Sequence, residues 1–155
     1  MQILLPETIE QRIIHSVKRA PHNEIGGILM GEHVSPDAFR ISELTIQTKG
    51  GSAITFIRSL SAIAIPLRRF FRQTRHRYTR FNYLGEWHSH PGLALIPSSR
   101  DCDSMWEIVE DARVGANFAI LLIVHCVTEV ELAGRVMVFL PGRQVFEGEL
   151  IREHQ

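Results

Sequence analysis

The sequence predicts an α/β fold, in which a mixed and mostly antiparallel sheet carries helices on its faces. Three observations lead to this fold class. Residues 7–19 follow an amphipathic helical pattern, and residues 24–33 and 38–48 have the pattern of two strands joined by a proline-containing turn. Residues 117–127 form a nearly continuous apolar run, which is typical of a central strand covered on both faces. With 155 residues, of which 45% are apolar, the chain is expected to form one domain, residues 1–155.

Before that pair of strands, residues 3–5 are expected to form a short edge strand or a lead-in. Pro6 suits the first turn of the helix that follows, and this helix should end near Pro21. The two strands after the helix are separated by so short a turn that they should form an antiparallel pair. Gly26 and Gly27 weaken the first of them, so we expect these glycines to let backbone or substrate pass close by.

Residues 49–52 have the composition of a loop, residues 53–58 favour a third strand, and residues 60–79 favour a helix that Ser59 would cap. Pro66 lies within this helical pattern, although it lacks the N–H that a helix interior needs. Either the helix kinks at Pro66 or it begins there, and the pattern does not decide between the two.

Arginines crowd this helical segment, and no acidic residue occurs between Glu43 and Glu86. One interpretation is a solvated helix face that the acidic C-terminal half of the chain balances. The other is a docking face for an acidic partner or for nucleic acid. The arginines concerned are Arg68, Arg69, Arg72, Arg75, Arg77 and Arg80.

Residues 83–90 are expected to form the next strand, from which a loop leads to a helix that Ser98 or Ser99 caps. In this strand Trp87 should point to the opposite face from His88 and His90, into the core. His125, inside the apolar run, is expected to be a core residue with a satisfied hydrogen bond.

The end of the chain should add two more strands. Residues 129–140 favour a strand with a bulge at Ala133 and Gly134, and residues 144–151 favour a last edge strand.

His88 and His90 stand two residues apart at the end of the strand expected at residues 83–90, so both side chains should leave the same face. Ser98 follows His90 after seven residues, and Asp101 follows Ser98 by three. A loop of that length can bring the carboxylate to the two imidazoles. Two imidazoles and one carboxylate, with a fourth position open to water, are typical ligands of a catalytic zinc.

Each half of this pattern also has a simpler interpretation. Eight histidines in 155 residues make one His-x-His pair unsurprising, and Ser98 with Asp101 fits a helix capping box. The two halves at this spacing, with a proline at each end of the loop, favour the metal site. Such a zinc needs a general base that is not a ligand, and an acidic residue on a neighbouring strand could serve. Glu24, which precedes the glycine-rich strand, is that residue. On position alone, Glu24 would be a solvated carboxylate at a strand end.

The order Glu, His-Ser-His-Pro and Ser-x-x-Asp resembles the motif of the JAMM (JAB/MPN-type) zinc metalloprotease family, and every motif position matches over nearly the whole chain. The resemblance implies an α/β/α sandwich of the cytidine-deaminase-like kind. It also implies that His88, His90 and Asp101 bind one Zn²⁺ per chain, that Glu24 is the catalytic base, and that Ser98 stabilises the oxyanion.

By this resemblance the chain is expected to be a deubiquitinase-like isopeptidase. The expected cut lies after the C-terminal glycine of a ubiquitin-like protein, or of a protein conjugated through such a tail. The short length of the chain and its Gly-Glu-Trp-His-Ser-His-Pro sequence are most similar to those of short bacterial stand-alone members, including deconjugases of anti-phage CBASS operons. The alternatives are a processing peptidase for a sulfur-carrier β-grasp protein, a non-catalytic MPN interaction scaffold and a DNA-associated JAB-like protein. A zinc nucleoside deaminase would need a Pro-Cys-x-x-Cys ligand pair, which the chain lacks.

Composition argues against several other classes. The formal net charge is zero, so no bulk field favours nucleic acid or an anionic membrane as a partner. The first residues do not resemble a signal peptide, and no stretch reaches the roughly 18 apolar residues of a membrane span. Cys102 and Cys126 have neither zinc-ribbon nor redox spacing, so we expect two reduced thiols in a cytoplasmic protein.

Overall fold

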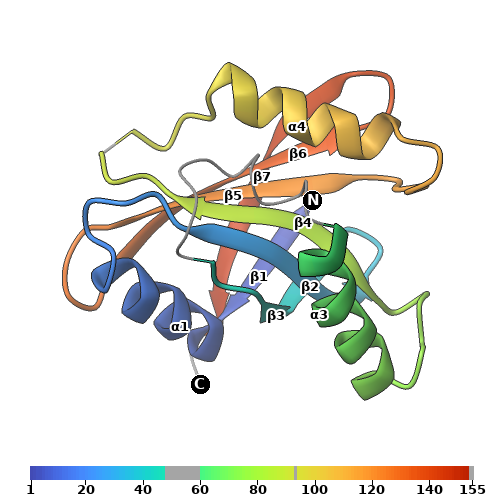
Figure 1. The fold of residues 1–155 in the computed structure, drawn as a ribbon, viewed down its shortest axis with the longest axis horizontal. Coiled ribbons are helices and arrows are strands. Elements are labelled where there is room, and N and C mark those ends of the chain that lie inside the picture. Colours follow the sequence, from blue (N-terminus) through green and yellow to red (C-terminus); the bar gives the residue numbers. More distant parts are fainter. Residues whose placement is uncertain (48–59, 93, 154–155) are drawn as a thin grey trace.

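The computed structural model describes residues 1–47, 60–92 and 94–153 (Figure 1). The helices in this part of the chain are α1 (Glu7–Lys18), α3 (Leu60–Gln73) and α4 (Ser99–Glu110), and none of them is both long and apolar enough to cross a membrane. The strands are β1 (Gln2–Pro6), β2 (Gly26–Ser35), β3 (Ala38–Leu44), β4 (Phe81–Ser89), β5 (Ala119–Cys126), β6 (Leu132–Leu140) and β7 (Gln144–Glu153). The loop expected at residues 49–52, the strand expected at 53–58 and the cap expected at Ser59 lie outside the described residues.

The strands form one sheet in the order β1-β3-β2-β4-β5-β6-β7, and β1 closes it into a barrel because it pairs with both β3 and β7. Four neighbouring pairs are antiparallel and three are parallel, which confirms a mixed, mostly antiparallel sheet. The simple α/β/α sandwich is wrong, since the sheet closes on itself. The strands expected at residues 3–5 and 144–151 are present as β1 and β7, but neither is an edge, because β1 runs parallel to β7, from Gln2 opposite Glu149 to Pro6 opposite Glu153.

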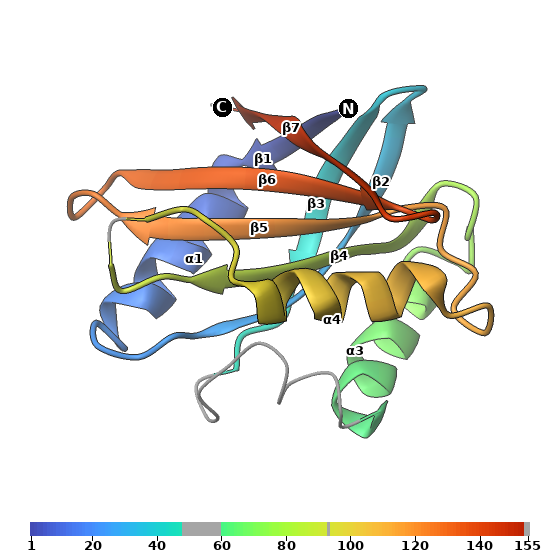
Figure 2. The same cartoon turned by 90° about the horizontal axis from the view of Figure 1, so that it is seen from above.

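The two faces of the sheet are covered by different helices (Figure 2). Ile9 and Ile13 of α1 belong to the inner cluster, which contains Leu122 of β5 and residues from the other strands. Met105 of α4 packs instead against Leu121, the neighbouring residue of β5, which points to the outer face. The apolar run at residues 117–127 is therefore a central strand covered on both sides, as predicted.

Helix α3 lies on the outer face against β2, where Phe70 packs with Ile28 and Met30. It already includes Leu60, so the alternative that it begins at Pro66 is wrong, and the proline lies inside the helix. The helix ends at residue 73 rather than at residue 79.

The early end of α3 follows from the backbone of the two residues Arg75 and His76. Both take left-handed conformations, with φ of 56° and 54°, and such conformations do not continue a right-handed helix.

All six arginines of the segment 68–80 are exposed. The Arg80 guanidinium donates to Glu32 Oε1 at 2.6 Å, and it lies 5.4 Å from the ring centroid of Phe81. Among the described residues no carboxylate pairs with the other five. Both interpretations of this segment, a solvated face and a docking face, remain predictions.

Strand β6 pairs with β5 without a register shift from Leu132 to Phe139, so the bulge predicted at Ala133 and Gly134 is wrong. A Cβ at Gly134 would lie 2.8 Å from Cδ2 of Leu150 in β7. The glycine therefore makes room for a packed side chain rather than for an extra residue.

Candidate metal centre

The two histidines of the predicted zinc pattern lie at the end of β4, between β2 and β5. Gly26 of β2 and Ile123 of β5 stand opposite His88. His88 and His90 face the same side, as expected from the strand period: their Nε2 atoms are 3.0 Å apart and their rings stack at 18°. Trp87, which precedes His88, points to the other face and is fully buried in the inner cluster, which confirms its predicted role.

Glu24 reaches the histidines from the segment just before β2. Its Oε1 atom lies 3.8 Å from Nε2 of His88 and 3.8 Å from Nε2 of His90. The approach depends on Gly26, because a Cβ there would lie 2.2 Å from the carbonyl oxygen of Trp87 and 2.9 Å from Cβ of His88. As predicted, this glycine lets the backbone of β2 pass close to the site.

Helix α4 brings Asp101 to the same place. Ser98 is its N-cap: the Ser98 Oγ accepts from the backbone N–H of Asp101 at 3.2 Å. Oδ2 of Asp101 in turn accepts from the backbone N–H of Ser98 at 2.7 Å and from its hydroxyl at 2.6 Å. The capping box is therefore confirmed, and it does not exclude the metal site, because the same Oδ2 lies 3.9 Å from Nε2 of His88. The cap orients the carboxylate towards the imidazoles.

The structure brings the five predicted site residues together, with one difference in detail. Glu24, His88 and His90 each offer a donor atom within 4.8 Å of the other two, whereas Asp101 is not part of this mutual group. The most compact donor set thus contains the residue expected to be the base. Imidazole nitrogens and carboxylate oxygens are ligands that zinc accepts, so the residues present fit such an ion.

Burial sets the protonation of these groups. It lowers the pKa of His88 to about 4, an effect that Asp101 opposes and His90 reinforces. The imidazole is therefore neutral near pH 7, with a lone pair available to a metal. Burial also raises the pKa of Glu24; Asp101 reinforces this shift and His90 opposes it. A carboxyl group whose pKa moves towards neutral pH exchanges protons more effectively in catalysis.

The centre opens to the surface through a pocket of about 420 Å³, whose walls include Glu24, His90, Ser98, Arg100 and Asp101. Two of the three predicted ligands, the predicted base and the helix cap therefore face a space that a substrate can enter.

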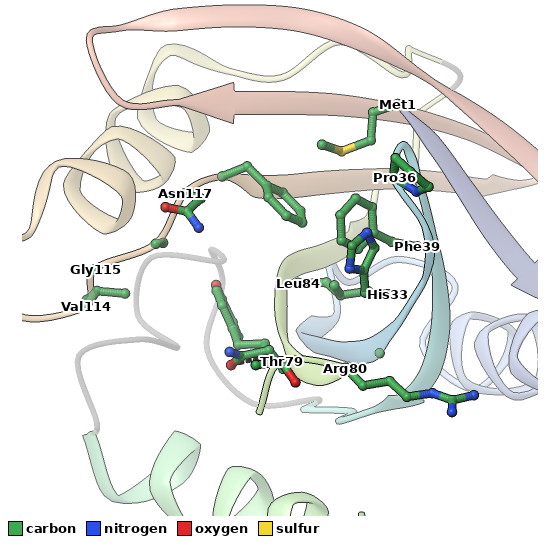
Figure 3. Close-up of a pocket in the computed structure, with 15 residues that line it drawn as sticks. Met1, His33, Pro36, Phe39, Thr79, Arg80, Leu84, Val114, Gly115 and Asn117 are labelled. Carbon is green, nitrogen blue, oxygen red and sulfur yellow. Dashed lines mark hydrogen bonds between the residues drawn. The ribbon is translucent and has the colours of Figure 1, made fainter. Parts of the chain in front are cut away.

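A second pocket, of about 480 Å³, lies at the opposite end of β4 (Figure 3). Phe39 forms part of its wall and stacks on His33, with ring centroids 4.8 Å apart, while Arg80 is directed away from the cavity. Among the described residues that line this pocket, His33 brings one imidazole but no carboxylate or thiol accompanies it, so the mixed donor set of the first centre is missing here.

A family described as prokaryotic homologs of the JAB domain has a sequence profile that matches residues 6–137, which include every predicted site residue. The chain belongs to this family. A relative of this JAB chain is the "CD-NTase/cGAS isopeptidase" of Enterobacter hormaechei subsp. hoffmannii (strain UCI 50), which is 31% identical over 114 residues, or 71% of the chain. The chain spans 59% of the length of that relative.

Solved structures with the same fold as this JAB chain include two solution structures. A protein from Desulfitobacterium hafniense is 18% identical, with a TM-score of 0.62 and coverage of 99% of this chain and 94% of that one. A protein from Salinibacter ruber (strain DSM 13855) is also 18% identical, with a TM-score of 0.56 and coverage of 99% and 92%.

The JAB centre contains one acidic residue that the sequence analysis did not single out. Glu86 precedes His88 by two residues on β4, and only 3% of it is exposed. Burial raises the pKa of its carboxyl group to about 8, and Asp101 adds to the shift. The signal was present in the sequence, because the period of a strand puts Glu86 on the same face as His88.

Glu86→Met is expected to stabilise the metal-free protein more at about pH 8 than at about pH 5. Between the ordinary pKa of 4.5 and the folded value of about 8, the folded chain holds a proton that the unfolded chain has released. The free energy of unfolding therefore falls as pH rises, by at most about 1.4 kcal/mol per pH unit. Methionine removes this dependence. Thermal unfolding of both proteins in chelator measures the difference, and a difference that does not grow with pH would contradict the burial of a protonated acid.

Proposed function

We propose that this JAB chain, residues 1–155, is a zinc-dependent isopeptidase. It cleaves the bond after the C-terminal glycine of a ubiquitin-like protein, or of a protein conjugated through such a tail. The observation that carries the proposal is the position of Glu24, whose Oε1 atom lies 3.8 Å from both imidazoles although more than sixty residues separate it from them in the chain. A carboxylate that approaches two paired histidines without being required as a ligand is suited to act on a water molecule there.

The residues divide into those that hold the metal and those that move protons. His88, His90 and Asp101 hold one Zn²⁺, and Glu24 remains free as the base. When bound, zinc acts as a Lewis acid that polarises a carbonyl and makes a water molecule more acidic. Glu24 accepts the proton of the attacking water and then delivers it to the departing amine. The raised pKa of Glu24 lies closer to neutral pH, which supports both the acceptance of a proton from water and its delivery to the amine.

Ser98 stabilises the negative charge that develops on the carbonyl oxygen of the substrate. Its hydroxyl donates to Asp101 Oδ2 in this structure, so the role requires the hydroxyl to turn towards the substrate. Asp101 would hold the metal in the loaded protein, and its carboxylate would then be a weaker acceptor for that hydrogen. The N-terminus of α4 adds a favourable dipole for the same negative charge.

Ser98→Ala is expected to reduce turnover by about 10²–10³-fold through the lost oxyanion donor. It should also lower the free energy of unfolding by about 1 kcal/mol, because the N-cap is lost. Ser99→Ala is the matched control: Ser99 is the neighbouring exposed residue at the first helical position, and both quantities should stay at their wild-type values. Steady-state kinetics and denaturant unfolding measure the two effects separately. A Ser98→Ala enzyme that is destabilised but fully active would restrict the serine to its capping role.

The substrate class is supported by the relative in Enterobacter hormaechei, whose name describes an isopeptidase of a CD-NTase. We infer that this chain likewise removes a ubiquitin-like conjugate, as a bacterial deconjugating enzyme of an anti-phage system. The deciding experiment incubates the chain with small β-grasp proteins that carry C-terminal extensions, either as linear fusions or as lysine conjugates, with and without a chelator. Chelator-sensitive cleavage after the terminal glycine supports the proposal. Cleavage of linear sulfur-carrier fusions alone would point to processing, and binding without cleavage would point to a scaffold.

A further inference from the structure

Two buried polar atoms at the metal centre have no hydrogen-bond partner. In the described part of the chain three buried side-chain atoms are in this state: Glu86 Oε1, His88 Nδ1 and, on β6, Arg135 Nε. Unpaired buried polar groups are uncommon in folded proteins and are destabilising. Two of the three belong to residues that lie two positions apart on one strand.

The two ring nitrogens of His88 have different surroundings. Its Nε2 faces the other donors, 3.0 Å from Nε2 of His90 and 3.8 Å from Oε1 of Glu24. When Nε2 binds a metal through its lone pair, the neutral imidazole carries its hydrogen on Nδ1. That N–H lies in a fully buried side chain and needs an acceptor to orient the ring.

The neighbouring strands supply no such acceptor. Gly26 and Ile123 stand opposite His88, and Ile28 and Leu121 stand opposite Glu86. These four residues have no polar side-chain atom. Within the described parts of β2 and β5, the side chains directly opposite this stretch of β4 therefore offer no acceptor, which leaves Glu86 as the candidate on the strand itself.

Glu86 has the reach that the contact requires. The pairing of β4 with β2 and β5 is regular from residue 85 to residue 88, so Glu86 and His88 leave the same face, about 6.6 Å apart along the strand. A glutamate side chain has three rotatable bonds, and rotation about them carries Oε1 towards the Nδ1 of His88. One hydrogen bond would then satisfy both orphaned atoms.

We propose that Glu86 is a positioning residue that accepts the Nδ1–H of His88 and so fixes the tautomer and ring orientation in which Nε2 binds the metal. The inference rests on the proposed zinc site and deepens it. A carboxylate or carbonyl behind a metal-binding histidine commonly raises metal affinity by one to two orders of magnitude.

The test compares the zinc affinity of variants by competition with a chromophoric chelator. Glu86→Met removes the acceptor but keeps the shape, and it should fold well because it replaces an unpaired buried acid by an apolar group. Its zinc affinity is expected to fall by about 10- to 100-fold. Glu86→Gln keeps a carbonyl acceptor at the same position, and its affinity should stay within about threefold of wild type.

A second variant addresses the rival acceptor on α4. Ser104 is buried in the middle of this helix, one turn after Asp101, and carries a hydroxyl that can also accept a hydrogen bond. Ser104→Ala should leave the zinc affinity unchanged. Nitrogen-15 NMR of the zinc-loaded protein gives an independent readout, since a slowly exchanging Nδ1–H of His88 should be present in wild type and in Glu86→Gln and absent in Glu86→Met.

Several results would overturn the assignment. A Glu86→Met protein that binds zinc as tightly as wild type, a Glu86→Gln protein as weak as Glu86→Met, or a Ser104→Ala protein that reproduces the loss would each remove Glu86 from this role. A wild-type protein that binds no zinc would overturn the proposed function as well. If the zinc affinities follow the expected order but the protein has no isopeptidase activity, the positioning role of Glu86 would stand and only the proposed function would be rejected.

Discussion

Glu24→Gln is expected to lower isopeptidase turnover by about 10²–10⁴-fold while the protein retains one zinc per chain. Glutamine has the shape of glutamate but cannot accept a proton at neutral pH, so only proton transfer is removed. The side chain of Glu24 is 31% exposed and accepts no hydrogen bond from the residues that the structure describes, so the fold should be unaffected. Single-turnover kinetics on a β-grasp fusion, together with the zinc content of the same preparation, measure both parts of the prediction.

The zinc content of this variant decides between two roles. Glu24 belongs to the compact group with His88 and His90, which is the arrangement of a ligand, whereas the proposal makes it the base. A variant that is inactive and has lost its zinc would make Glu24 a ligand rather than the base. A variant that cleaves at the wild-type rate would exclude Glu24 from the chemistry altogether.

His88→Ala is expected to abolish both zinc binding and turnover. His88 is the one residue that lies near all the other candidates, with its Nε2 atom 3.0 Å from His90, 3.8 Å from Glu24 and 3.9 Å from Asp101. Its removal leaves no arrangement of three close donors among these residues. Zinc content should fall from one per chain to background, and activity should fall with it.

His33→Ala is the matched control for this loss. His33 is also a histidine in a ring stack, 4.8 Å from Phe39, but it lines the pocket at the other end of β4. This variant should keep its zinc and its activity. If His88→Ala retained stoichiometric zinc, the metal would have to lie elsewhere and the proposed centre would be wrong.

Most of the centre could be predicted because its parts obey local rules. The two-residue period of a strand put His88 and His90 on one face and Trp87 on the other. The spacing of Ser98 and Asp101 predicted a helix cap, and the cap is present. The proposed ligand role of Asp101 was the competing interpretation, and the structure allows both because one carboxylate oxygen accepts the capping bonds and also faces the imidazoles.

The closure of the sheet could not be predicted, because it depends on contacts between distant segments. Residues 2–6 pair in parallel with residues 149–153, and nothing in a five-residue apolar segment specifies which neighbours it will have. A short terminal strand read from the sequence alone is therefore expected at an edge. The end of α3 was missed for a similar reason: the arginine-rich pattern continues past Gln73, but Arg75 and His76 adopt left-handed conformations.

The burial of Glu86 could not be predicted from the sequence. Its position two residues before His88 can be read from the sequence, but an acid in a strand is usually solvated, and only the structure shows that Glu86 is buried. Its partners across the sheet, Ile28 and Leu121, belong to the clusters packed under α3 and α4. The burial, rather than the residue type, makes it a candidate for positioning His88.

The most direct test of the account is the metal content of the protein purified without chelators, measured by elemental analysis against protein concentration. The account predicts one zinc ion per chain, lost in His88→Ala and retained in Glu24→Gln. A native protein that carries no tightly bound metal, and that takes up none when zinc is supplied, would contradict it.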